Sequence, residues 1–313
     1  MVIRHLEKIN INNSEQWILV RGEAENTPLI LHVQAGPGLP IIPEANTLEK
    51  LLRLEEKHLV AYWDQRACGK SFGKIPDESS MNLDQLADDV LENTKYLLNK
   101  YKKEKAVVVG YSIGATLSLM AATKNSNLFE HLFLVGIDVD IPYANEYALK
   151  FALKKANELN NSRLAKQAND LMNIPITNST LFRKRAKLLT NAGGMNTKSS
   201  YNQLMKAAIT NMILCKEYKL NDIIKTIKGM EYCQNTLLPE MNALNLFDRI
   251  KSVNVPVHFI QGKLDGISPY DKVVQFFEYL ISPNKTFTAF NNSAHMPHYE
   301  EPEKFARMLK ENY

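Results

Sequence analysis

Residues 106–114 read Ala-Val-Val-Val-Gly-Tyr-Ser-Ile-Gly, and they join two patterns that together decide the fold. The apolar run at 106–109 is typical of a strand at the centre of a parallel sheet, which is covered on both faces. Gly110–Gly114 has the form G-x-S-x-G, in which a serine occupies a sharp turn between a strand and a helix. A helical pattern follows at 115–123. The stretch therefore predicts a strand-turn-helix unit that presents Ser112 as a nucleophile.

Strand and helix patterns alternate around this unit and then give way to helices alone. Strands are expected at 16–20, 28–33, 58–63, 131–135, 255–260 and 286–290, and helices at 45–54, 82–100 and 302–310. This alternation predicts an α/β protein with a mostly parallel central sheet. Further helical patterns occur at 147–159, 181–189, 201–213 and 220–228. We therefore expect a core built from residues 1–142 and 246–313, interrupted by a helical insertion at 143–245.

The composition excludes several classes of function. Of 313 residues, 45% are apolar and 23% charged, and the net charge of +4 is too small to indicate a nucleic-acid partner. Three cysteines without a C-x-x-C pair argue against a disulfide framework, and no metal or other cofactor is expected. The uncharged stretch 106–123 falls short of the about 20 strongly apolar residues that span a membrane. Without an export signal, a cytoplasmic protein with no membrane partner is expected, and its oligomeric state stays open.

A serine nucleophile needs a base, and seven histidines are available. His295 is the favoured base because it follows the last strand, where α/β proteins build their sites, and His298 is its competitor. The acid that orients the base is expected between the serine and the histidine in the chain. Asp265 follows the strand at 255–260 and is favoured, whereas Asp138 and Asp140 are the alternatives.

Two backbone N–H groups should stabilise the oxyanion that forms when the serine attacks. One belongs to Ile113, at the start of the helix that follows the nucleophile. The other is expected in the loop at residues 34–38, which reads Gln-Ala-Gly-Pro-Gly and follows an early strand. Because Pro37 has no N–H, Gly36 is the expected second donor.

At this point the sequence resembles the α/β-hydrolase superfamily, and within it the proline iminopeptidase-like branch. That branch typically reads His-Gly-Gly-Pro-Gly where this chain has residues 34–38. It reads Trp-Asp-Gln-Arg-Gly-x-Gly-x-Ser where residues 63–71 are Trp-Asp-Gln-Arg-Ala-Cys-Gly-Lys-Ser. The segment around His295, with Glu300-Glu301-Pro302-Glu303 after it, is similar as well. The resemblance implies an α/β-hydrolase fold in which the helical insertion is the family's cap.

The chain departs from the family pattern at several positions near the expected site. Gln34 and Ala35 replace a histidine and a glycine, and an alanine at position 35 would be strained if that position needs a positive φ. Asp64 and Arg66 are expected to form a structural charge pair near the site. Family aminopeptidases hold the substrate's amino group with cap glutamates, and some have a glutamate directly after the catalytic aspartate, where this chain has Gly266. The insertion contains Glu217, Glu231 and Glu240.

The sequence therefore predicts a serine hydrolase acting through an acyl-Ser112 intermediate. The resemblance implies an aminopeptidase of the proline iminopeptidase kind, with a short peptide as substrate. A carboxylesterase or other small-molecule acyl hydrolase is the close alternative, and a non-catalytic ligand-binding protein of the same fold is the alternative from another class. Residues 143–245 contain 15 lysines and arginines against 7 aspartates and glutamates, so the insertion carries +8 and the remainder −4. A basic insertion would on average attract anionic substrates, which weighs against the peptidase interpretation.

Overall fold

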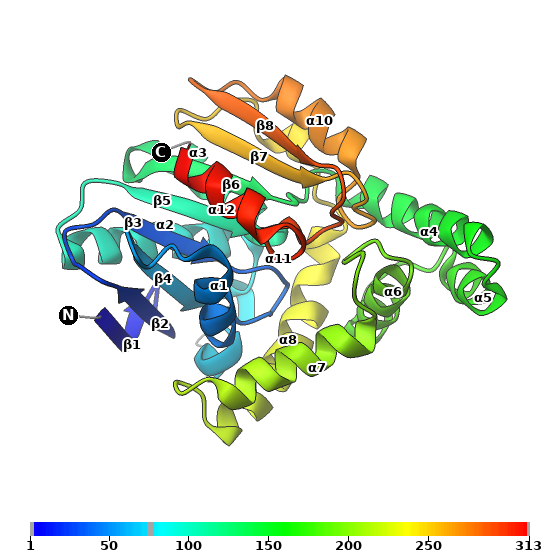
Figure 1. Ribbon diagram of the computed structural model, residues 1–313, viewed down its shortest axis with the longest axis horizontal. Helices are drawn as coiled ribbons and strands as arrows, with labels where there is room; N and C mark the ends of the chain where they lie inside the picture. Colours follow the sequence, from blue (N-terminus) through cyan, green and yellow to red (C-terminus); the bar gives the residue numbers. More distant parts are fainter. Residues whose placement is uncertain (1–2, 74–77, 312–313) are drawn as a thin grey trace.

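An eight-stranded sheet runs through the centre of the molecule (Figure 1). The computed structural model describes residues 3–73 and 78–311. The strand order is β1-β2-β4-β3-β5-β6-β7-β8, in which β1 and β2 are antiparallel to their neighbours and the pairs from β4 to β8 are parallel. The strands are β1 (Ile3–Ile11), β2 (Ser14–Gly22), β3 (Leu29–Val33), β4 (Leu59–Asp64), β5 (Ala106–Tyr111), β6 (Phe129–Val135), β7 (Val257–Gly262) and β8 (Lys285–Phe290). The predicted α/β class with a mostly parallel sheet is confirmed.

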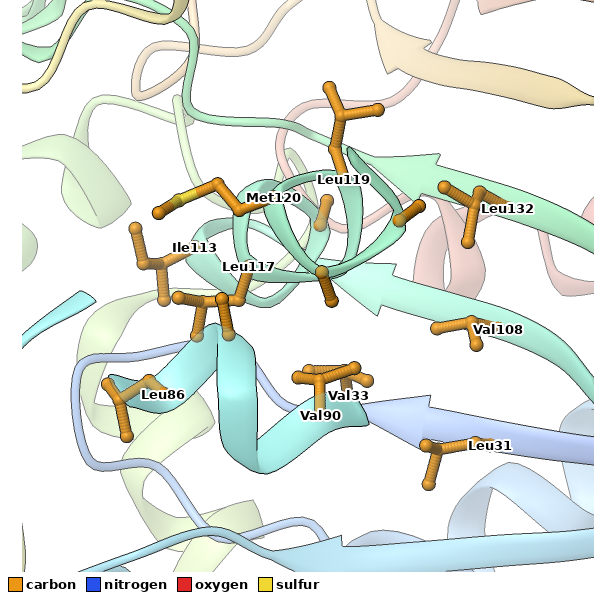
Figure 2. Close-up of a cluster of buried hydrophobic side chains, with 14 of the residues drawn as sticks. Leu31, Val33, Leu86, Val90, Val108, Ile113, Leu117, Leu119, Met120 and Leu132 are labelled. Atoms are coloured by element: carbon orange, nitrogen blue, oxygen red, sulfur yellow. The ribbon is translucent and has the colours of Figure 1, made fainter. Parts of the chain in front are cut away.

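Both faces of the sheet are covered, because alternate side chains of each central strand enter different cores. Val108 of β5 belongs to one apolar cluster, and its neighbours Val107 and Val109 belong to another. Figure 2 shows part of the first cluster, where Val108 and Leu132 of the sheet lie beside side chains of α2 and α3. This burial on both sides explains why the strand is an unbroken apolar run in the sequence.

The helices of the core divide between the two faces according to these clusters. On one face pack α2 (Leu83–Tyr101), α3 (Ile113–Lys124) and α10 (Tyr270–Tyr279). On the other pack α1 (Ala45–Leu52) and α12 (Pro302–Glu311). The short elements are η1 (Ile42–Glu44), η2 (Gly69–Ser71), η3 (Glu78–Ser80), η4 (Ser126–Leu128), α9 (Leu246–Arg249) and α11 (Pro297–Glu300). Such three-layer packing places the carboxyl ends of the parallel strands at one edge, where α11 also lies.

A group of helices follows β6 and precedes β7 in the chain. These inserted helices are α4 (Ile141–Glu158), α5 (Ser162–Leu171), α6 (Ser179–Asn191), α7 (Tyr201–Leu214) and α8 (Leu220–Met241). Helices α4, α5 and α6 bury a small apolar cluster of their own, whereas α8 runs back along the core (Figure 1). The helical content expected at 143–245 is therefore observed, and the division into domains at those residues stays a prediction.

Several elements were not expected from the sequence. The edge strand β1 is missing from the predictions because its apolar residues, Ile3, Leu6, Ile9 and Ile11, do not alternate regularly with its polar ones, and it pairs with β2 alone. Helices α5 and α10 were also missed. Around the motif the predicted elements are present with shifted ends, since β5 continues to Tyr111 and α3 begins at Ile113. Among the described residues, no helix is both long and apolar enough to span a membrane.

Candidate active site

Ser112 occupies the sharp turn between β5 and α3. Its backbone angles are φ 53° and ψ −125°, a conformation that L-residues rarely adopt. The glycines of the motif make this turn possible by close packing. A Cβ at Gly114 would lie 2.2 Å from the carbonyl oxygen of Gln34, and a Cβ at Gly110 would lie 2.6 Å from the Cα of Ala115. Larger residues at either position would push the turn off the sheet.

His295 and Asp265 form a hydrogen-bonded pair at the ends of β8 and β7. The Nδ1 atom of His295 lies 2.8 Å from Oδ2 of Asp265. Asp265 is fully buried, and its Oδ1 accepts the backbone N–H groups of Ile267 and Ser268 at 2.7 and 2.9 Å. These donors hold the carboxylate in place, so Asp265 can orient the imidazole in the way that an acid orients a catalytic histidine.

The pKa of His295 reflects two opposing influences. Burial lowers the pKa, but the charge and the hydrogen bond of Asp265, together with the charge of Asp138, raise it above its usual value. The net shift is upward, which suits a group that takes up a proton during a reaction.

Ser112 and His295 both lie against the turn that follows β6. The backbone N–H of Ser112 donates to the carbonyl of Val135 at 2.8 Å. One residue further on, a Cβ at Gly136 would lie 2.9 Å from Cε1 of His295. Both predicted site residues therefore border the same turn, although they lie 183 positions apart in the chain. The fold thus brings Ser112, His295 and Asp265 to one end of the sheet.

His298, the competing base, lies in the apolar core. Its ring centroid is 4.5 Å from that of Tyr111 and 4.5 Å from that of Tyr299. Burial lowers its pKa to about 3, so the imidazole stays neutral. These contacts suit a packing residue, and they leave His295 as the histidine that is bonded to a carboxylate at this site.

The two alternative acids have separate environments. Asp140 accepts the backbone N–H of Tyr143 at 3.0 Å, which caps α4, and lies 3.4 Å from Nζ of Lys272. Asp138 instead lies at the nucleophile, because the hydroxyl of Ser112 donates to its Oδ2 at 3.1 Å. Neither arrangement orients His295 directly, so the geometry favours Asp265 as the acid.

Asp138 is the site residue whose position the sequence did not reveal. Its Oδ1 accepts the hydroxyl of Ser268 at 3.0 Å, and the residue is 8% exposed. Burial raises its pKa, an effect that the charge of His295 and the hydroxyl donors partly offset. In the sequence Asp138 was recognisable only as a carboxylate after a strand, with no indication that it would face Ser112.

The oxyanion loop at residues 34–38 lies against the start of α3. A Cβ at Gly36 would be 3.5 Å from Cγ2 of Ile113, so the two expected N–H donors belong to adjacent segments. Gln34 accepts the backbone N–H of Gln65 through Oε1 at 3.1 Å, which ties the loop to the end of β4. Ala35 does not have a positive φ, and the strain considered for this position is therefore absent.

The positive φ occurs instead at Ala67, with a value of 60°. This residue stands where the family pattern has the first glycine after Trp-Asp-Gln-Arg. An alanine in the left-handed region costs about 1–2 kcal/mol relative to the usual regions. Ala67 is buried, and its carbonyl oxygen packs closely against Gly229 of α8. These contacts hold the strained backbone in place.

The expected charge pair between Asp64 and Arg66 is wrong. Arg66 donates through Nε and Nη2 to Asp89 of α2 at 2.8 and 2.9 Å, and both side chains of this pair are buried. Asp64 accepts the backbone N–H groups of Ile41 and Ile42 and the hydroxyl of Tyr218. The strand β4 ends at Asp64, so Arg66 does not follow the strand geometry, and each side chain finds its partner elsewhere.

The inserted helices contact the loops that hold the acid and the base. The backbone N–H of Gly266 donates to the carbonyl of Gly194 at 2.9 Å, and that of His295 donates to Met195 at 3.2 Å. Glu300 accepts the backbone N–H and the hydroxyl of Thr197. The segment after α6 is thereby fastened directly to the candidate site.

Arg185 of the inserted helices is close enough to the candidate site for the charge of Asp138 to act on it. Arg185 of α6 donates to the side chain of Asn145 on α4. Burial lowers the pKa of Arg185 to about 10, although the charge of Asp138 acts in the opposite direction. The three glutamates considered as anchors for a substrate amine have other environments. Glu217 pairs with Arg4, Glu240 accepts the backbone N–H of Leu83, and Glu231 is exposed.

The three cysteines, Cys68, Cys215 and Cys233, are free and buried. Within residues 3–73 and 78–311, no group of three or more His, Cys, Asp or Glu side chains is arranged to hold a metal ion.

Comparison with known proteins identifies relatives that match most of the chain. The chain is 26% identical over 304 residues to a probable aminopeptidase of Bacillus subtilis, covering 97% of this chain and 94% of that protein. It is 24% identical over 285 residues to a proline iminopeptidase of Heyndrickxia coagulans, covering 90% and 89% of the two chains. A proline iminopeptidase-related protein of Thermus thermophilus has a similar fold, with a TM-score of 0.66, 17% identity and coverage of 99% and 96%.

These relatives confirm the resemblance to the proline iminopeptidase-like branch that the motifs at residues 34–38 and 63–71 indicated. The model of one family, described as the alpha/beta hydrolase fold, matches residues 28–302. That range includes Ser112, Asp265 and His295. The chain therefore belongs to the alpha/beta hydrolase fold family.

Proposed function

We propose that this hydrolase is a serine enzyme that cleaves an acyl bond in two steps through an acyl-Ser112 intermediate. The observation that carries the proposal is the turn after β6, which Ser112 with its strained backbone borders on one side and the hydrogen-bonded His295–Asp265 pair borders as well. In this mechanism Ser112 turns its hydroxyl from Asp138 to His295 by rotation about χ1 and attacks the substrate carbonyl. His295 takes the proton as general base, then gives it to the leaving group as general acid.

The second half of the reaction uses the same groups. Water attacks the acyl-enzyme while His295 removes its proton, and Ser112 is released. The N–H groups of Gly36 and Ile113 stabilise the oxyanion in both steps, supported by the dipole at the start of α3. Asp265 keeps Nδ1 of His295 protonated and stabilises the imidazolium that forms.

The substrate class proposed first is a short peptide with a free N-terminus, from which the enzyme releases the N-terminal residue. The printed names of the two sequence relatives, a probable aminopeptidase and a proline iminopeptidase, support this class. The inserted helices act as a cap in this proposal. This role is supported by the hydrogen bonds that join the segment after α6 to the loops of Asp265 and His295.

A specific observation favours a second candidate, a carboxylesterase or other small acyl hydrolase using the same residues. Glu217 forms an ion pair with Arg4, and Glu240 accepts the backbone N–H of Leu83. Glu231 is exposed. Among the described residues, no hydrogen bond or ion pair joins any of these three carboxylates to Ser112, Asp265 or His295. The third candidate, a ligand-binding protein without turnover, rested on the altered oxyanion loop, and it is weakened because Ala35 carries no backbone strain.

The test compares hydrolysis of proline p-nitroanilide with hydrolysis of short p-nitrophenyl esters by the same purified protein. Release of p-nitroaniline supports the aminopeptidase, and activity on esters alone would establish the esterase instead. A fluorophosphonate probe tests the serine mechanism separately. Labelling of the wild type that disappears in Ser112→Ala supports it, and an unlabelled but well-folded wild type favours the binding protein.

A further inference from the structure

The carboxylate of Asp138 is a buried charge beside the nucleophile with no cation within ion-pair distance among the described residues, although the charges of His295 and Arg185 act on it from farther away. Its two hydrogen-bond donors are the uncharged hydroxyls of Ser112 and Ser268. Among the ion pairs formed by the described residues, none within 4.0 Å includes Asp138. Its neighbour Asp140 has Lys272, whereas Arg185 donates its hydrogen bond to Asn145. Because a buried carboxylate is costly unless a cation accompanies it, Asp138 is suited to receive one from a ligand.

A carboxylate in this position also opposes the reaction of a neutral substrate. Attack by Ser112 creates a negative oxygen within a few ångströms of Oγ, and the charge of Asp138 lies 3.1 Å from that same Oγ. Like charges at such a separation repel, most strongly where water is excluded. A substrate that brings a positive charge next to its scissile carbonyl removes this repulsion. The site therefore distinguishes acyl groups by their charge.

Bond lengths define where that positive charge must be. In an N-terminal residue the amino nitrogen is two bonds from the carbonyl carbon, roughly 2.5 Å away by standard backbone dimensions. When Ser112 attacks this carbon, the nitrogen comes within roughly 3 Å of Oγ by the same dimensions. Oδ2 of Asp138 lies 3.1 Å from the same Oγ, so an acyl group oriented with its amine toward Asp138 brings the two within hydrogen-bonding reach. A carboxylate on a distant helix is unnecessary for this contact.

We propose that Asp138 is the binding residue for the α-ammonium group of the substrate, and that it selects acyl groups with a free primary or secondary amine. The inference rests on the proposed serine hydrolase function and assigns the amine anchor to the core of the fold. The ammonium displaces the Ser112 hydroxyl from Asp138, which frees this hydroxyl to turn toward His295. Amine binding and activation of the nucleophile are coupled in this way.

The test uses two methyl esters that differ only in the charged group, proline methyl ester and methyl cyclopentanecarboxylate. The rate of hydrolysis is measured by titrating the released acid at constant pH. The wild type should prefer the prolyl ester in kcat/KM. In Asp138→Asn this preference should fall by about 10- to 100-fold, the range expected for loss of a charge-assisted hydrogen bond. Asp140→Asn is the matched control, since it changes a carboxylate of the same loop that faces Lys272, and it should keep the wild-type preference.

Fluorophosphonate labelling of each variant reports whether Ser112 is folded and reactive. A labelled Asp138→Asn that keeps the full preference would overturn the inference and leave the serine hydrolase standing. A labelled wild type that treats both esters alike would overturn it as well and would favour the esterase. A wild type that neither labels nor hydrolyses either ester would overturn the proposed function and the inference together.

A measurement on the wild type keeps the inference testable if Asp138→Asn does not fold. Prolinamide and cyclopentanecarboxamide are compared as competitors of fluorophosphonate labelling. Prolinamide should protect Ser112 at a concentration at least about tenfold lower, because only its amine can bind Asp138. Equal protection by the two amides would contradict the assignment.

Discussion

The hydroxyl of Ser112 lies between two carboxylate systems that have different partners. Asp138 accepts its hydrogen bond directly, and Asp265 is hydrogen-bonded to the imidazole of His295. Ser268 connects the two, because its hydroxyl donates to Asp138 and its backbone N–H donates to Asp265. At the scale of single residues, then, the roles of similar side chains are decided by what each one contacts.

The first prediction at this scale concerns Asp265. Asp265→Asn should lower kcat on a p-nitrophenyl ester by about 10⁴-fold, because the amide cannot hold Nδ1 of His295 in the protonated state. Asp140→Asn should leave this activity close to that of the wild type. Full activity in Asp265→Asn, combined with loss of activity in Asp138→Asn on the same ester, would show that Asp138 is the acid.

The second prediction concerns pH. His295 must be neutral to accept the proton of Ser112, and its pKa is raised by Asp265 and Asp138 in spite of burial. The kcat/KM should therefore rise with pH through a midpoint above 6.5, the usual histidine value. In Asp265→Asn the midpoint should move to lower pH, because a negative charge next to the imidazole has been removed. A wild-type midpoint below 6.5 would contradict the raised pKa.

At the scale of elements, α8 is placed by a close contact with the strained segment after β4. Gly229 of α8 lies against the carbonyl of Ala67, so the helix approaches at a distance that no larger residue permits. The same part of α8 contributes Cys233, whose side chain packs beside Gly38 of the oxyanion loop. The position of α8 therefore supports the loop that contains Gly36.

Gly229→Ala should lower the free energy of unfolding by about 1–3 kcal/mol, as overpacking does in well-packed cores. A Cβ at this position would lie 2.4 Å from the carbonyl oxygen of Ala67. The direction is informative because alanine in a helix interior is otherwise more favourable than glycine by about 1 kcal/mol. Thermal or urea unfolding measures the effect, and Lys228→Ala, at the exposed neighbouring position, is the control. An unchanged or increased stability in Gly229→Ala would show that α8 does not approach Ala67 this closely.

The elements also show how far a sequence pattern predicts structure. The patterns at 106–109 and 115–123 located β5 and α3, since burial on both faces requires unbroken apolar residues there. The edge strand β1 and the surface helices α5 and α10 escaped prediction, because an element that is covered on one side contains many polar residues. Strand β1 is paired with β2 alone and α5 shares an apolar cluster with α4 and α6, so these elements depend on contacts that the periodicity of one segment does not describe.

At the scale of the whole molecule, a basic insertion is joined to an acidic core. The inserted helices carry +8 over residues 143–245, and the remainder carries −4. Among the described residues, two ion pairs between the two parts have both side chains less than a tenth exposed. Nη2 of Arg21 lies 3.7 Å from Oε1 of Glu217, and Nζ of Lys70 lies 2.8 Å from Oδ2 of Asp222 on α8. Lys70 also lies 4.6 Å from the ring of Trp17 in the sheet, so this pair connects α8 to the core.

Asp222→Asn should destabilise the protein by about 3–5 kcal/mol, the usual cost of leaving one partner of a buried pair uncompensated. The asparagine oxygen can still accept the backbone N–H of Lys219, so the start of α8 is preserved and the loss reports on the charge. Lys225→Gln is the control, because Lys225 lies 4.0 Å from Asp222 and is more exposed. The Tm should fall clearly in Asp222→Asn and little in Lys225→Gln. Equal and small shifts in both would mean that the pair does not join the two parts of the molecule.

The sequence by itself determined the α/β class, the strand-turn-helix unit around Ser112 and the places of Asp265 and His295 at the ends of later strands. These features depend on the spacing of apolar residues, on glycines and on the order of motifs, all of which can be recognised in the sequence itself. The tertiary structure alone decided that Arg66 pairs with Asp89, that strain lies at Ala67 and that Asp138 faces the nucleophile. Contacts between residues far apart in the chain depend on how strands and helices pack, and single-residue patterns contain no record of that packing.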